Sequence, residues 1–128
     1  WLRDGLGLLD RSDQAGPKTS HVTLAAVGNG EELRAVLERS LGVLVTVDKR
    51  REICYIENVK FHVDLVEGLG AFVEIEACGK REEEAALLCQ CREYMELFRI
   101  REEELVEKSY SDLLMERRIR YSVSRIPE

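Results

Sequence analysis

The stretch that decides the fold is Val47–Glu76, which reads VDKRREICYIENVKFHVDLVEGLGAFVEIE. Two short polar reversals divide it into three segments in which apolar and polar residues alternate. The first reversal places Glu57 and Asn58 between two apolar residues, which is typical of a two-residue hairpin loop. The second contains Gly68 and Gly70, and glycine adopts positive φ at little cost. The stretch therefore predicts three consecutive antiparallel strands joined by tight turns.

Charged side chains recur at every second residue of these strands, so they share one face of the predicted sheet. By strand, this charged face carries Lys49 and Arg51, then Lys60, His62 and Asp64, then Glu74 and Glu76. Arg50 and Glu52 point to the opposite face, where we expect them to be solvated or salt-bridged rather than catalytic. The opposite face is otherwise mostly apolar, which suits packing against helices.

The turns set which charged residues meet across the strands. The two-residue first turn places Arg51 opposite Asp64. For the two carboxylates to share a face, we expect the second turn to pair Val66 with Phe72. Asp64 then lies opposite Glu74, and the sequence predicts a row of Arg51, Asp64 and Glu74 across the sheet.

Such a row has two interpretations. Adjacent carboxylates in a strand pair repel each other, and a divalent cation that prefers oxygen ligands would relieve the repulsion. The neighbouring lysine and arginine side chains suit a phosphate chain. The alternative is a solvated sheet face that carries mixed charges, because antiparallel sheets often face water on one side.

Motifs in and around the stretch resemble the CYTH superfamily of triphosphate tunnel enzymes, and in particular its class IV adenylate cyclase-like branch, which is related to thiamine triphosphatase. The central motifs are K-R-R-E at 49–52, D-x-V-E-G-L-G at 64–70 and F-x-E-I-E at 72–76. Upstream, residues 10–18 resemble the family segment R-x-D-x-A-G-P-K, and downstream, residues 108–114 resemble its closing S-Y-S-D-L-L. The resemblance covers about residues 8–114.

The resemblance implies an α+β fold, an antiparallel β-barrel flattened into a tunnel with a polar interior and decorated by helices. It implies triphosphate ligands among the cations of the chain, which we assign to Lys18, Lys49, Arg51, Arg11 and Arg3. It also implies ligands for Mg²⁺ or Mn²⁺, which we assign to Asp64, Glu74 and Glu76. For Arg3, solvent exposure is an equal alternative, and Lys18 without the resemblance is a flexible surface lysine. No catalytic residue is assigned.

The implied activity is metal-dependent processing of ATP or another triphosphate, either cyclisation of ATP to cyclic AMP or hydrolysis. The family's N-terminal E-x-E-x-K motif does not precede Arg11. We therefore expect an incomplete tunnel that lacks its N-terminal strands, and a poor or inactive enzyme in isolation. Two alternatives stay open, an inactive module that binds triphosphates or nucleotides and a structural interaction domain. A homodimer is also expected from the resemblance.

Composition narrows the remaining classes. The chain has 128 residues and a net charge of −6, with no basic excess that would favour nucleic acid. Its four cysteines form no C-x-x-C pair, so we expect reduced thiols and no zinc site. With no leader and no apolar run near 18 residues, we expect a soluble cytoplasmic protein that is not bound to a membrane.

The rest of the chain predicts a strand at 21–27, a helix at 31–41 that packs on the sheet, a long helix at 80–99 and a helical turn at 102–107. We expect a partial CYTH-like domain at 1–114 and a basic extension at 115–128, which is either a flexible tail or a partner-binding segment.

Overall fold

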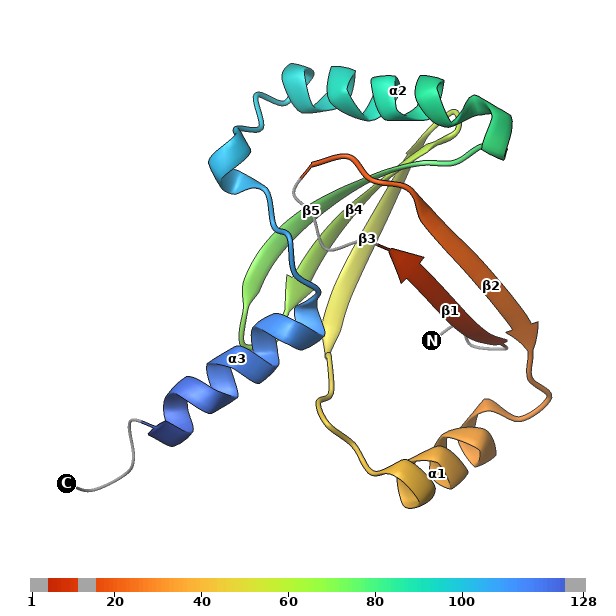
Figure 1. Cartoon of the computed structure of the whole chain (residues 1–128), viewed down its shortest axis with the longest axis vertical. Coiled ribbons are helices and arrows are strands. Elements are labelled where there is room, and N and C mark those ends of the chain that lie inside the picture. Colours follow the sequence, from red (N-terminus) through yellow and green to blue (C-terminus); the bar gives the residue numbers. More distant parts are fainter. Residues whose placement is uncertain (1–4, 12–15, 124–128) are drawn as a thin grey trace. The chain divides into compact units, whose positions relative to one another are not determined.

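The computed structural model describes residues 5–11 and 16–123 (Figure 1). The chain divides into two compact units, one made of residues 1–12 and 19–44 and the other of residues 13–18 and 45–128. Within the described ranges, no helix is long and apolar enough to cross a membrane. The four cysteines are free.

The first unit contains a hairpin and one helix. Strands β1 (Gly5–Arg11) and β2 (Ser20–Ala26) pair antiparallel. Helix α1 (Gly30–Leu41) begins where the side chain of Asn29 accepts a hydrogen bond from a backbone N–H of the first turn. The predicted strand and helix are confirmed to within a residue at each end. The expected packing of the helix is not, because α1 carries no buried residue.

The second unit is built on the predicted three-stranded sheet, in which β4 (Val59–Val66) lies between β3 (Lys49–Ile56) and β5 (Gly70–Ala77). The first turn is the expected two-residue loop, and Glu57 adopts a positive φ of 52° there. The sheet is antiparallel throughout, and its first register is the predicted one, with Arg51 opposite Asp64.

The second register differs from the prediction. The turn pairs Val66 with Gly70, so Asp64 lies opposite Phe72 rather than Glu74, and Glu74 lies opposite His62. The turn is shorter because Gly68 and Gly70 both adopt positive φ, of 79° and 102°, and the chain reverses within three residues. The shift is two residues, an even number, so the carboxylates still share the charged face.

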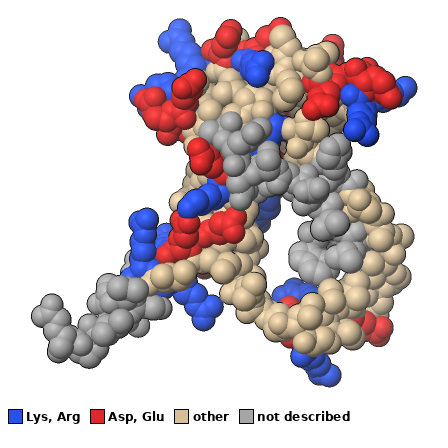
Figure 2. All heavy atoms as spheres, viewed as in Figure 1, with Lys and Arg blue, Asp and Glu red and all other residues tan. Residues whose placement is uncertain are grey.

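Helix α2 (Glu84–Leu97) packs on the apolar face, and a 3₁₀ turn precedes it, so the regular helix begins later than predicted. The ring of Phe61 meets those of Tyr94 and Phe98 edge-on, at centroid distances of 4.9 and 5.7 Å. Asn58 and Gln90 exchange hydrogen bonds of 2.9 and 3.1 Å, which fix the helix at the β3–β4 turn. Acidic and basic side chains are interspersed over the outer surface of α2 (Figure 2).

Helix α3 (Tyr110–Val123) begins at a reciprocal cap. The hydroxyl of Ser109 accepts from the backbone N–H of Asp112, while the Asp112 carboxylate accepts from the backbone N–H of Ser109. This cap makes Tyr110 the first helical residue. The helix continues across residue 115, where we expected an extension to begin, and a 3₁₀ turn at Glu102–Glu104 precedes it.

These elements confirm the α+β class. The described strands form two separate antiparallel sheets, β1-β2 and β3-β4-β5, and no strand pairing between the two closes them into the expected barrel.

Candidate functional site

The charged face of the sheet is the more buried face along the second half of β4. Asp64 is 1% exposed and His62 is 5% exposed, whereas their apolar neighbours Val63 and Leu65 are 47% and 59% exposed. Charged and polar side chains are buried more deeply than their apolar neighbours only when they are paired with other polar groups. This is because burying an unpaired charge has a large free-energy cost. Among the described residues, no buried side-chain nitrogen or oxygen lacks a partner.

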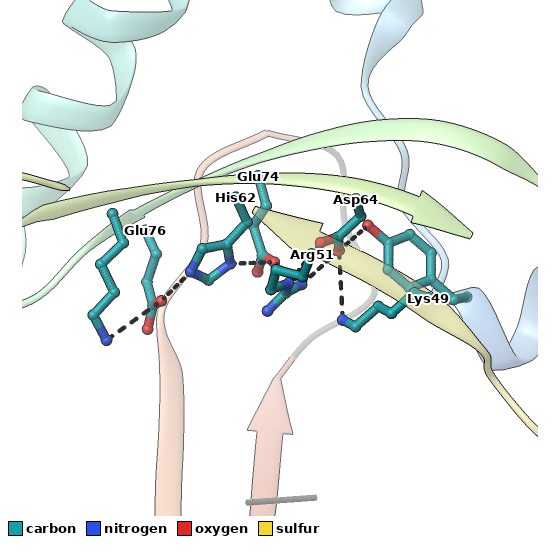
Figure 3. Close-up of polar contacts among 8 residues, drawn as sticks. Lys49, Arg51, His62, Asp64, Glu74 and Glu76 are labelled. Atoms are coloured by element: carbon teal, nitrogen blue, oxygen red, sulfur yellow. Dashed lines mark hydrogen bonds and ion pairs between the residues drawn. The ribbon is translucent and has the colours of Figure 1, made fainter. Parts of the chain in front are cut away.

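The strongest contact on this face joins Arg51 and Asp64 (Figure 3). Nε of Arg51 donates to Oδ1 of Asp64 and Nη2 donates to Oδ2, both at 2.6 Å. This two-point geometry follows from the planar guanidinium, which matches a carboxylate edge to edge. The guanidinium holds the pKa of Asp64 well below its usual range, and the hydrogen bonds to Asp64 raise the pKa of Arg51.

Two further groups donate to the same carboxylate. Nζ of Lys49 lies 3.4 Å from Oδ2 of Asp64, and the hydroxyl of Tyr110 donates to Oδ2 at 2.9 Å. The ring of Tyr110 packs on Phe72 with centroids 4.9 Å apart, and Nζ of Lys49 lies 5.2 Å from its centroid. Burial, with the hydrogen bond to Asp64 as a second cause, raises the pKa of Tyr110.

Glu74 and Glu76 meet around His62. Oε2 of Glu74 accepts from Nη2 of Arg51 at 3.0 Å and lies 3.1 Å from Nδ1 of His62. Oε2 of Glu76 lies 3.4 Å from Nε2 of the same ring and 3.8 Å from Nζ of Lys60. The imidazole therefore bridges the two glutamates, whose side chains are both half-exposed.

The structure thus brings five of the predicted residues into one continuous network through direct contacts or through His62; these are Lys49, Arg51, Asp64, Glu74 and Glu76. Lys18 donates to the backbone carbonyl of Glu107 at 3.5 Å, shortly before α3 begins. Arg11 is the last residue of β1, where its backbone lies opposite Ser20. Arg3 lies outside the described residues.

The three carboxylates of this network differ in how well they could hold a divalent cation. Asp64 accepts at Oδ1 from Arg51 and at Oδ2 from Arg51, Lys49 and Tyr110, so four donor contacts already surround this carboxylate. Glu74 and Glu76 each engage only Oε2 with the side chains described, which leaves Oε1 of each to accept a hard cation. No group of three or more His, Cys, Asp or Glu side chains in the described ranges is placed to hold a metal ion.

Tyr110 is the member of the site that sequence reasoning missed. It lies in the S-Y-S-D-L-L segment, 46 residues from Asp64, and no periodic pattern connects a helix N-terminus to a strand so distant. His62 was recognised as a neighbour of Asp64 on the charged face. Its bridging of Glu74 and Glu76 depends on the shorter second turn, which the sequence analysis did not predict.

Comparison with known proteins agrees with the motifs. The CYTH domain family model matches residues 12–110. Among solved structures, the fold is similar to that of a conserved hypothetical protein from Pyrococcus furiosus, with a TM-score of 0.62 and 24% sequence identity over 85% of this chain and 67% of that chain. Comparison with curated proteins gives no significant match. The family match spans most of the chain, from the segment before Lys18 to the tyrosine that contacts Asp64, and the chain therefore belongs to the CYTH domain family.

Proposed function

We propose that the charged face of β3, β4 and β5 binds the phosphates of a triphosphate compound. The observation that carries the proposal is the state of the Arg51 guanidinium. Its Nε and Nη2 are engaged by Asp64 and Glu74, while no described residue accepts a hydrogen bond from Nη1. The guanidinium is held in place through Nε and Nη2, and Nη1 is left to donate to an anion. Because the side chain is already ordered, binding an anion avoids the entropy cost of ordering it.

The surrounding charges support a phosphate rather than a carboxylate ligand. Lys49 lies on the same face, and its ammonium is held between Asp64 and the Tyr110 ring. A triphosphate spreads its charge along a chain of oxygens, so several cations in a row suit it better than one. Lys18, Arg11 and Arg3 remain proposed as further phosphate ligands by resemblance to the family.

Glu74 and Glu76 are the residues we propose to hold Mg²⁺ or Mn²⁺, through the oxygens that no described side chain engages. A bound ion would neutralise charge on the phosphates during phosphoryl transfer. The chain's own contribution is to orient the triphosphate and to offset its charge with Lys49 and Arg51. Both cyclisation of ATP and hydrolysis of a triphosphate fit this arrangement, and so does binding without turnover.

Calorimetric titration of tripolyphosphate and of ATP, each with and without Mn²⁺, tests the proposal. The parent chain should bind both anions, and Arg51→Gln should weaken binding by about 10-fold or more, because it removes a charge-assisted hydrogen bond. Arg50→Gln is the matched control, since its side chain lies on the opposite face and pairs with Glu52. A folded parent chain that binds neither anion would refute the proposal that this face binds phosphates.

A further inference from the structure

Asp64 has the surroundings of a residue that holds other side chains in place. It is almost fully buried, it lies on the central strand, and it accepts from three donor residues on two other elements: Lys49 and Arg51 on β3, and Tyr110 on α3. A carboxylate with this many short donors would have to exchange several of them for a cation that brings its own positive charge. The resemblance to the family suggested that Asp64 binds metal, and the contacts favour another role.

That role follows from what Arg51 would do without Asp64. The side chain of Arg51 is 27% exposed, and its guanidinium lies at the end of several rotatable bonds. The two 2.6 Å hydrogen bonds fix its plane and direct Nη1 away from the carboxylate. Tyr110 contributes the fourth hydrogen bond and thereby limits the rotation of the carboxylate itself.

We propose that Asp64, held by Tyr110, is a positioning residue that presents the Nη1 group of Arg51 to the bound phosphate, and that it does not bind the metal ion. The inference rests on the proposed function, because it assigns a role within the same site. It also makes the first residue of α3 part of the phosphate site, although that helix has no other proposed ligand.

Removing the charge of Asp64 distinguishes two effects of this residue: its effect on the orientation of Arg51 and the effect of its negative charge on anion binding. Asp64→Asn deletes a negative charge beside an anion site, and by charge alone this would strengthen binding of a polyphosphate. Loss of orientation acts in the opposite direction. We expect the affinity for tripolyphosphate, measured by calorimetry in EDTA, to fall by about 10-fold, as is usual when the partner of a ligand side chain is lost.

Tyr110→Phe removes only the hydroxyl and keeps the ring on Phe72, so it provides a milder variant should the asparagine variant unfold. We expect a smaller loss of tripolyphosphate affinity in the same direction, about 3-fold, since one neutral hydrogen bond is lost. Tyr94→Phe, which also removes a hydroxyl from a ring packed on a phenylalanine but lies on the opposite face of the sheet against Phe61, is the matched control and should leave the affinity unchanged.

Binding of Mn²⁺ alone, followed by the electron paramagnetic resonance signal of the free ion, provides the second measurement. The positioning role predicts that neither Asp64→Asn nor Tyr110→Phe changes the Mn²⁺ dissociation constant by more than about 2-fold, because neither removes a metal ligand. Glu74→Gln, in contrast, should weaken it. Nuclear magnetic resonance of the Arg51 Nε–H, identified by its loss in Arg51→Gln, should show faster exchange with solvent in both Asp64→Asn and Tyr110→Phe.

The outcomes are distinguishable. A parent chain that is folded but binds no tripolyphosphate overturns the proposed function, and the inference with it. A parent chain that binds tripolyphosphate, with an Asp64→Asn variant that binds it as well or better, overturns the positioning role alone. So does an Asp64→Asn variant that loses Mn²⁺ affinity by 10-fold or more, which would make Asp64 a metal ligand.

Discussion

Arg50 and Arg51 are neighbours on β3 that lie on opposite faces of the sheet. The contribution of Arg51 to the free energy of unfolding can therefore be measured with Arg50 as an internal reference. Arg51→Ala and Arg50→Ala are the same chemical change on adjacent residues, so differences in strand propensity largely cancel. Arg50 pairs with Glu52 at 3.3 Å, with side chains that are 80% and 68% exposed. Exposed pairs of this kind contribute about 0 to 1 kcal/mol, and Arg50→Ala should be nearly neutral.

Arg51→Ala should be much more costly because it leaves the Asp64 carboxylate buried with only Lys49 and Tyr110 as partners. Removing one partner of a buried ion pair costs about 3 to 5 kcal/mol. The lower end, about 3 kcal/mol, applies here because Arg51 itself is partly exposed and two donors remain. For a chain of this size, that loss corresponds to a fall in Tm of roughly 10 °C.

The assay must report on this sheet alone, since the chain divides into two compact units and unfolding need not be a single transition. Amide hydrogen exchange of β4 residues meets this requirement, with urea unfolding followed by circular dichroism as a global measure. Equal losses of stability for Arg50→Ala and Arg51→Ala, or a loss under about 0.5 kcal/mol for Arg51→Ala, would refute the reasoning that Asp64 is a buried charge held mainly by Arg51.

The pH dependence provides a second check on the same pair. Because the pKa of Asp64 is lowered in the folded state, its contribution to stability is present above the unfolded pKa and is lost as pH falls through the folded value. The stability difference between the parent chain and Asp64→Asn should therefore be constant from pH 8 to pH 5. It should narrow only below about pH 4, near the unfolded pKa of aspartate. A difference that changed between pH 8 and pH 5 would contradict this assignment.

Three further predictions concern other parts of the second unit. In a spectrophotometric titration, one of the four tyrosines should ionise later than the others because the pKa of Tyr110 is raised, and Tyr110→Phe should remove that late step. Brief alkylation followed by peptide mass spectrometry should label Cys89 before Cys91, because burial raises the pKa of the Cys91 thiol and a neutral thiol reacts slowly; equal labelling would count against this. Asn58→Ala should lower stability by about 1 to 2 kcal/mol, and a double-mutant cycle with Gln90→Ala should show coupling, since the two amides bond each other; strict additivity would mean that they act independently.

The sequence by itself determined the local features of the sheet. Alternation with a period of two assigns each residue of β3, β4 and β5 to a face, and this holds whatever packs on the sheet. A two-residue loop fixes the first register, and with it the pairing of Arg51 and Asp64. The register between β4 and β5 was predicted wrongly by two residues. A glycine-rich turn can have more than one length, and both lengths leave the carboxylates on the same face of the sheet.

Only the tertiary structure decided which face is buried and what completes the site. Period-two alternation is the same whether the polar face lies outside or inside, so the near-complete burial of Asp64 follows from long-range packing. The contact between Tyr110 and Asp64 joins the start of a helix to the middle of a strand, and its geometry depends on where the cap of Ser109 begins that helix. Local sequence patterns specify which face of an element each side chain lies on. Burial and long-range hydrogen bonds depend instead on which elements pack together, and here the packing of α3 against the sheet orders the row of charged side chains.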